Sequence, residues 1–144
     1  DRPYFSDLVL ALQNTFLYGP SAVCFFPNPV EPGIIGEIAD LLIRAKDIKQ
    51  LLCAGRVGQD VLVSARTTTD GGDALALCRR SLKGFGYAGG HGHRAGGRVP
   101  LSGSSTAIPE DMQNSIRANW LKACGVSETR GVRLVSRKEI LDNL

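Results

Sequence analysis

The sequence predicts a single α/β domain in which helices flank a mixed β-sheet. Segments with the three-to-four-residue periodicity of helices alternate with short runs of strand-forming residues. Two of these runs are joined by a short glycine-containing segment, which indicates a β-hairpin and therefore some antiparallel pairing. The length of 144 residues is typical of one domain.

A helix is expected near the N-terminus, because apolar side chains recur there at helical spacing, at Phe5, Leu8, Leu12 and Phe16. Ser6 or Asp7 can cap this helix, and Gly19-Pro20 is expected to end it. The apolar run Ser21–Phe26 predicts a strand, since prolines follow it directly. A second helix is expected after Pro32.

The middle of the chain predicts a hairpin and a third helix. Two strand-like runs, Ile48–Ala54 and Asp60–Arg66, enclose five residues with two glycines, which suits a hairpin loop. Asp70 or Asp73 can cap the helix that follows and runs to about Lys83.

The last third of the chain begins with a glycine-dense segment, residues 84–97. Each glycine costs a helix about 1 kcal/mol, so we expect a loop there, followed by a closing strand at Arg98–Leu101. Thr106 can cap a long final helix that ends at Gly125. Val132–Val135 has the composition of an edge strand. The stripe of the final helix consists of Ile108, Met112, Ile116, Trp120 and Ala123.

Composition limits the class of protein. The 43% hydrophobic and 22% charged fractions are ordinary for a globular domain. No apolar run approaches the roughly 18 residues of a membrane span, so no membrane partner is expected. The widely spaced cysteines lie in apolar stretches, which favours buried free thiols and a cytoplasmic location over disulfides or a zinc site. They are Cys24, Cys53, Cys78 and Cys124. The chain begins with Asp1, and we expect it to be part of a longer protein.

Charge is distributed unevenly along a chain whose net charge is +3. The window Ala74–Pro109 contains no Asp or Glu but holds both histidines. It also contains Arg79, Arg80, Lys83, Arg94 and Arg98. This window predicts a positive surface that favours an anionic ligand, and a solvated basic face explains the same charge.

The most specific segment is Gly89–Gly97. Paired glycines let a backbone approach a ligand closely and turn its N–H groups toward an anion. His91 adds a directed hydrogen-bond donor. The alternative is a flexible glycine loop with an exposed histidine.

A second candidate feature lies on the predicted strand Asp60–Arg66. Alternation places Ser64 and Arg66 on the face opposite the apolar residues. The planar guanidinium fork matches phosphate oxygens, which favours an anion-binding role near the end of the strand. The alternative is a surface arginine paired with Asp70 or Asp73. For a binding role, Arg66→Ala is expected to weaken substrate binding and to disturb folding little.

The order of these motifs resembles the type-one DHH-associated domain over about residues 23–101. The matching residues are Ala39, Asp40 and Leu42, then Ser64, Arg66 and Thr67, then Gly89, Gly90, His91, Ala95, Gly96 and Gly97. In that family the domain is the C-terminal half of cytoplasmic phosphoesterases. These include nano-RNA oligoribonucleases, pAp phosphatases, RecJ-type exonucleases and exopolyphosphatase-related proteins.

The resemblance implies that a separate DHH half binds manganese and hydrolyses the substrate. It also implies that this half binds the nucleotide or nucleic-acid end through Arg66, His91, Gly89 and Gly90. Ser64 and Thr67 are further candidates, and His93 and Arg94 are local additions suggested by charge alone. The sequence has no Asp-His-His triplet, so we predict neither a catalytic residue nor a metal ligand here. A small metal site built from His91, His93 and Asp70 is an alternative.

We therefore divide the chain into an N-terminal helix or linker from the missing half (1–20), a substrate-binding domain (21–102) and a helical extension (103–144). The expected ligand is a short oligonucleotide or phosphorylated nucleotide, and the expected partner is the protein's own DHH catalytic domain. One alternative is a free-standing nucleic-acid-binding module of the kind appended to alanyl-tRNA synthetase-like proteins. Another is dimerisation through Met112, Ile116 and Trp120, for which ordinary core packing is the favoured explanation.

Overall fold

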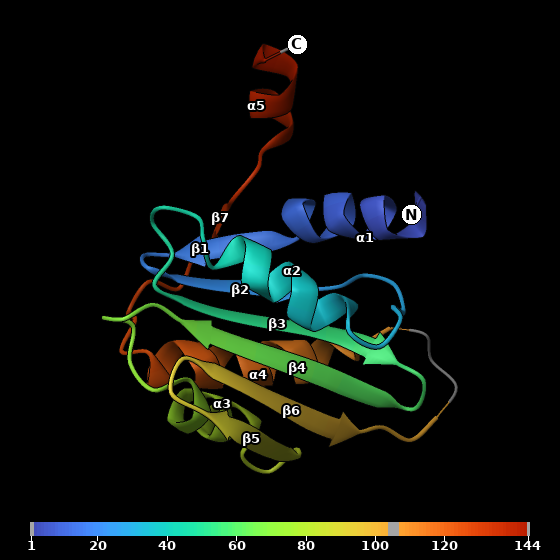
Figure 1. The fold of residues 1–144 in the computed structure, drawn as a ribbon, viewed down its shortest axis with the longest axis vertical. Helices are drawn as coiled ribbons and strands as arrows, with labels where there is room; N and C mark the ends of the chain where they lie inside the picture. Colours follow the sequence, from blue (N-terminus) through green and yellow to red (C-terminus); the bar gives the residue numbers. More distant parts are fainter. Residues whose placement is uncertain (1, 104–106, 144) are drawn as a thin grey trace.

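Helices cover both faces of one mixed β-sheet in the computed structural model, which describes residues 2–103 and 107–143 (Figure 1). Within those residues the sheet has seven strands, in the spatial order β5 (Tyr87–His91), β6 (Arg94–Pro100), β4 (Asp60–Thr67), β3 (Gln50–Val57), β2 (Ser21–Phe25), β1 (Thr15–Tyr18) and β7 (Val132–Arg133). Strands β2 and β3 are parallel, and the other neighbouring pairs are antiparallel. The predicted α/β class with a mixed sheet is confirmed.

The helices form the outer layers of the fold. Those in the described part of the chain are α1 (Arg2–Gln13), α2 (Ile34–Leu42), α3 (Ala74–Leu82), α4 (Glu110–Ala123) and α5 (Arg137–Asp142). Helices α1 and α2 pack on one face of the sheet, and α3 and α4 pack on the other. Helix α5 stands away from the body of the domain (Figure 1). No helix among the described residues is both long and apolar enough to cross a bilayer.

The N-terminal helix is shorter than predicted, and a strand follows it. Helix α1 begins before Ser6 and Asp7, so neither residue caps it, and it ends at Gln13. Thr15 then donates a hydrogen bond to Ala11 O at 2.7 Å and opens β1. Gly19, with a φ of +61°, makes the turn into β2. The prediction of one helix as far as residue 18 was wrong because a four-residue strand adjoins the helix directly.

Both predicted glycine-containing connections are more regular than expected. The central hairpin is confirmed, but its loop is only Gly58-Gln59, because β3 continues to Val57 instead of ending at Ala54. The glycine-dense segment forms the hairpin β5–β6 instead of a loop. A Cβ on Gly86 or Gly97 would overlap backbone or the Leu82 side chain, so these glycines allow close packing.

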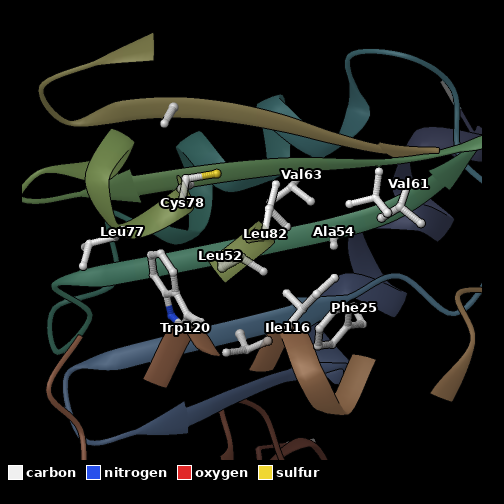
Figure 2. Packing of buried hydrophobic residues seen from close by; sticks show 14 of the residues in the cluster. Phe25, Leu52, Ala54, Val61, Val63, Leu77, Cys78, Leu82, Ile116 and Trp120 are labelled. Carbon is white, nitrogen blue, oxygen red and sulfur yellow. The ribbon is translucent and has the colours of Figure 1, made fainter. Parts of the chain in front are cut away.

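The final helix completes the larger core. Figure 2 shows Trp120 and Ile116 of α4 beside Phe25 and Leu52 of the sheet, and both α4 side chains are fully buried. Core packing therefore explains the apolar stripe, and Ile116 and Trp120 offer no exposed surface for dimerisation. The helix begins after Pro109. The predicted cap Thr106 lies outside the described residues.

Two local predictions from sequence are confirmed. Asp73 caps α3 by accepting hydrogen bonds from the N–H groups of Leu75 and Ala76 at 3.0 and 3.4 Å. The cysteines are free thiols, of which Cys124 is only partly buried. The division at residues 20 and 102 stays a prediction.

Candidate functional site

A shallow hollow of about 340 Å³ lies on the α2 side of the sheet, over the ends of three neighbouring strands. The residues around it are Ser64, Arg66, Gly90, His91, Arg94, Ala95 and Gly96. The strand register creates this grouping, because Arg66 of β4 pairs with Arg94 of β6, which pairs with His91 of β5. Paired residues on adjacent strands project from the same face, so three basic side chains form one row across the sheet.

Arg66 is the most constrained member of the row, with only 7% of the residue exposed. Its Nε donates to Asp40 Oδ1 at 2.8 Å, and its Nη1 donates to Ala65 O and Ala95 O at 2.9 and 3.2 Å. Within residues 2–103 and 107–143, Nη2 has no hydrogen-bond partner. Arg66 thus has a fixed guanidinium plane, and the two N–H groups of Nη2 are left without a partner among those residues.

These contacts correct two expectations. Arg66 pairs with Asp40 of α2 and with neither Asp70 nor Asp73, because α2 lies directly over this end of β4. A buried guanidinium that holds two backbone carbonyl groups also supports the fold. We therefore no longer expect Arg66→Ala to leave stability nearly unchanged.

Asp40 links the two arginines of the row. Its Oδ1 accepts from Arg66 and also from Arg94 Nη1 at 2.6 Å. Partial burial raises the pKa of Asp40, but hydrogen bonds and charge from the two guanidinium groups outweigh it and hold that pKa below its ordinary value. Two positive charges share one carboxylate, so the group keeps one net positive charge.

His91 and Arg94 supply the exposed part of the row. Both residues are exposed, and they face each other across the turn that joins β5 to β6. Arg94 was expected to contribute by charge only, yet the register places it in the centre of the row. Its guanidinium can turn toward an anion with little change in the backbone.

Thr67 and His93 lie together but away from the hollow. The Thr67 hydroxyl donates to Gly72 O at 2.8 Å and lies 2.9 Å from Nδ1 of His93. Because the single hydroxyl proton is used on Gly72 O, the hydroxyl accepts from a protonated Nδ1. Thr67 N also donates to His93 O at 3.0 Å. Neither residue lines the hollow. Their contacts instead hold the turn between β5 and β6 against the end of β4.

The glycines at this end of the sheet differ in whether the fold requires a glycine at their positions. Gly90 has a φ of +131°, and a Cβ there would overlap Arg94 O and Ala95, so the fold itself requires glycine. Gly89 does not line the hollow, but it pairs with Gly96 across the strands. A Cβ at Gly89 would meet no atom within 4 Å.

Helix α2 contributes a fourth glycine that sequence analysis did not single out. A Cβ on Gly36 would lie 3.5 Å from Arg66 Nη2 and 3.8 Å from Ser64 Oγ, which is ordinary contact. Glycine within a helix is unfavourable, and neither packing nor φ requires it here. Its effect is to keep a helix side chain away from Nη2 of Arg66. The signal in the sequence was a glycine inside an otherwise regular helical pattern.

The residues at this site do not fit a metal ion. Among the described residues, no three His, Cys, Asp or Glu side chains gather closely enough to hold one. His93 is engaged with Thr67, and Asp70 is paired with Lys49 at 2.9 Å. The alternative site from His91, His93 and Asp70 is therefore not assembled, and the manganese implied by the resemblance has no ligand set at this hollow.

A larger hollow of about 650 Å³ lies between the end of α1 and α5. Its charged lining residue is Arg133, whose Nη1 donates to Gln13 O at 2.6 Å and whose guanidinium lies over the Phe16 ring. That guanidinium already contacts a carbonyl group and a ring, and Arg133 is the single basic residue among the described residues of this lining. The smaller hollow with the basic row is the better anion site despite its size.

Neither a protein-family model nor a curated protein matches this sequence. Several solved structures share its fold, among them the following three. The C-Ala domain of Aquifex aeolicus alanyl-tRNA synthetase is 19% identical, with a TM-score of 0.55, over 72% of this chain and 92% of that chain. An exopolyphosphatase-related protein from Bacteroides fragilis is 14% identical, with a TM-score of 0.59, over 87% of this chain and 36% of that one.

The third structure is a pGpG-specific phosphodiesterase from Vibrio cholerae. It is 12% identical, with a TM-score of 0.53, over 88% of this chain and 40% of that one. This chain thus spans well under half of the two longer proteins and nearly all of the C-Ala domain. At these identities the likeness establishes the fold alone.

Proposed function

We propose that this chain is the substrate-binding domain of a cytoplasmic, manganese-dependent DHH-type phosphoesterase, and that it holds a phosphate group of a nucleotide or short oligonucleotide. The observation that carries the proposal is the basic row, in which Arg66, Arg94 and His91 come from three strands to one hollow. A site with two guanidinium groups, an imidazole and one shared carboxylate suits an anion better than a neutral ligand.

Each residue of the row has a distinct task in this proposal. Arg66 directs Nη2 into the hollow from a fixed plane, and Arg94 closes over the bound anion from the exposed side. His91 donates from the edge strand. Asp40 keeps the two guanidinium groups close together, which reduces the ordering cost of binding.

Bond cleavage is assigned to another part of the parent protein. The described residues offer no cluster of metal ligands, so we propose that manganese and the acidic residues belong to a separate catalytic half. The extent of the likeness supports this division, since the chain corresponds to 36% and 40% of the two phosphoesterase-type structures. Positioning alone can lower a reaction barrier by several kcal/mol.

The test compares two matched arginines of β6. Arg94 is 65% exposed and paired with Asp40, whereas Arg98 is 63% exposed and paired with Asp60, away from the hollow. We expect Arg94→Ala to weaken binding of ribose 5-phosphate, which carries no base, to the 144-residue chain by about tenfold in calorimetry, because one charge-assisted hydrogen bond is lost. Arg98→Ala should leave it unchanged. Equal effects of the two substitutions would indicate nonspecific charge attraction and would reject the site.

A second candidate function is a nucleic-acid-binding module without a catalytic partner. The likeness to the C-Ala domain favours it, because the shared unit covers 92% of that domain. Such a module contacts several phosphates, so its affinity should rise with RNA length and fall steeply with salt. A 5′-phosphorylated dinucleotide and a twelve-nucleotide RNA, compared at two salt concentrations, distinguish the two functions. Similar affinity for both ligands supports the substrate-binding domain.

A further inference from the structure

The outer face of the hairpin β5–β6 is exposed along its whole length. Helix α2 packs over β3 and β4 on this side of the sheet and leaves the two outer strands uncovered. The exposed residues that project from this face are Tyr87, Gly89 and His91 of β5 and Arg94, Gly96 and Arg98 of β6. The set contains three basic side chains and no acidic one. This face continues directly from the basic row.

Two glycines at the centre of this face have no structural reason to be glycine. Gly89 and Gly96 pair with each other and have ordinary negative or extended φ values. A Cβ at Gly89 would meet open space, and one at Gly96 would meet only Val63 O at 3.5 Å. Glycine inside a strand weakens the strand, and it often marks a position where a ligand approaches the backbone closely.

The neighbouring glycines provide the contrast. A Cβ on Gly86, Gly90 or Gly97 would overlap backbone or buried side chains, so packing alone explains them. Their Cβ positions lie against the structure, whereas those of Gly89 and Gly96 lie toward solvent on the same face as His91. The two unexplained glycines therefore form a bare, flat strip of backbone that begins at the basic row.

Tyr87 lies at the other end of this strip. Its side chain projects from the same face as His91, four residues further along β5, which corresponds to about 13 Å of strand. The residue is 74% exposed, an unusual exposure for a large aromatic side chain. Since α2 does not reach β5, nothing in the described part of the chain covers the ring on this face.

We propose that the Tyr87 ring is a stacking platform for a nucleobase of the ligand whose phosphate lies at the basic row, with Gly89 and Gly96 as the floor between them. This inference rests on the proposed function and adds a positioning residue to it. Stacking on an aromatic ring tolerates any base, because every base has a π-face. The phosphate sets the end of the ligand, and Tyr87 sets its direction across the sheet.

The test uses three probes of increasing length on the full 144-residue chain: ribose 5-phosphate, 5′-AMP and 5′-phosphorylated diadenylate. We expect Tyr87→Ala to weaken binding of at least one base-containing probe by about 5- to 150-fold, the range for one lost stacking contact. Binding of ribose 5-phosphate should not change. Tyr87→Phe should retain the affinity, because a phenyl ring also stacks.

The floor is tested separately by Gly89→Ala. A methyl group there meets no neighbour, so we expect the urea midpoint to stay equal or to rise, while the base-containing probes bind more weakly. Unchanged affinities of 5′-AMP and diadenylate in Tyr87→Ala would overturn the inference. An equal loss in Tyr87→Phe would also overturn stacking, since it would indicate a hydroxyl contact. Failure of the wild-type chain to bind any of the three probes would instead reject the proposed function itself.

Discussion

Replacing Arg66 with alanine is the perturbation whose consequences the structure defines best. The substitution removes a buried guanidinium that bonds Asp40, Ala65 O and Ala95 O. Breaking a fully buried ion pair typically costs about 3–5 kcal/mol. Here Asp40 is 42% exposed and retains Arg94, so we expect a loss of about 2–3 kcal/mol in the free energy of unfolding. A domain of this length has roughly 7–20 kcal/mol of stability, so the variant should still fold.

The same substitution should weaken phosphate binding. One hydrogen bond from a charged donor contributes about 1.5–3 kcal/mol, which corresponds to a loss of about 12- to 150-fold in affinity. Urea denaturation measures the stability, and calorimetry with 5′-AMP, at a temperature where the variant is folded, measures the affinity. Both changes are expected in one variant.

Arg56→Ala is the matched control for burial. Arg56 is 4% exposed, donates from Nε to Gly58 O at 3.0 Å and lies on the opposite face of the sheet. Its removal should also lower stability but should leave 5′-AMP binding unchanged. If folded Arg66→Ala bound 5′-AMP as tightly as the wild-type protein, Arg66 would have only a structural role and our account of the hollow would be wrong.

Three further predictions follow from individual residues. Gly36→Ala should raise the free energy of unfolding by up to about 1 kcal/mol, seen as a higher urea midpoint, because alanine favours a helix more than glycine does. It should also weaken 5′-AMP binding, because the added methyl group lies against Arg66 Nη2. A gain in stability with no loss of affinity would contradict the second expectation. The pKa of Asp40 is lower in the folded protein than in the unfolded chain, where it is about 3.9. Ionised Asp40 should therefore contribute fully to stability at a pH above about 3.9, and this contribution should be lost as the pH falls through the folded-state pKa. The difference in urea midpoint between the wild-type protein and Asp40→Asn should therefore shrink in acid, and a constant difference would refute it. Burial raises the pKa of Cys78 and of Cys124 to about 11, so a thiol reagent at neutral pH should label these residues far faster after unfolding than before.

Local sequence patterns were sufficient to predict features that depend on a single helix or strand. Alternation along β4 placed Ser64 and Arg66 on one face, and the Asp73 cap followed from side-chain chemistry. The glycine-dense segment could not be predicted as strands, because glycine disfavours a strand and only pairing with β4 stabilises the hairpin. β1 was missed because a strand of four residues follows α1 almost directly and shares its apolar composition.

The site was only partly predictable for a related reason. Arg66 and His91 were both expected to contact the ligand, and the structure places them around one hollow, although their roles stay predictions. Asp40 lies 26 residues before Arg66, so their ion pair depends on how α2 crosses the sheet. Thr67 and His93 are close to the motif in sequence, yet alternation along β4 turns Thr67 away from the hollow, and His93 lies in the β5–β6 turn beside Thr67.

The most direct measurement is an amide NMR titration of the 144-residue chain with 5′-AMP. We expect the largest shift changes on residues 64–66 and 90–96, which surround the basic row. Changes centred on Arg133 and α5, at the larger hollow, or spread evenly over the basic surface, would contradict it.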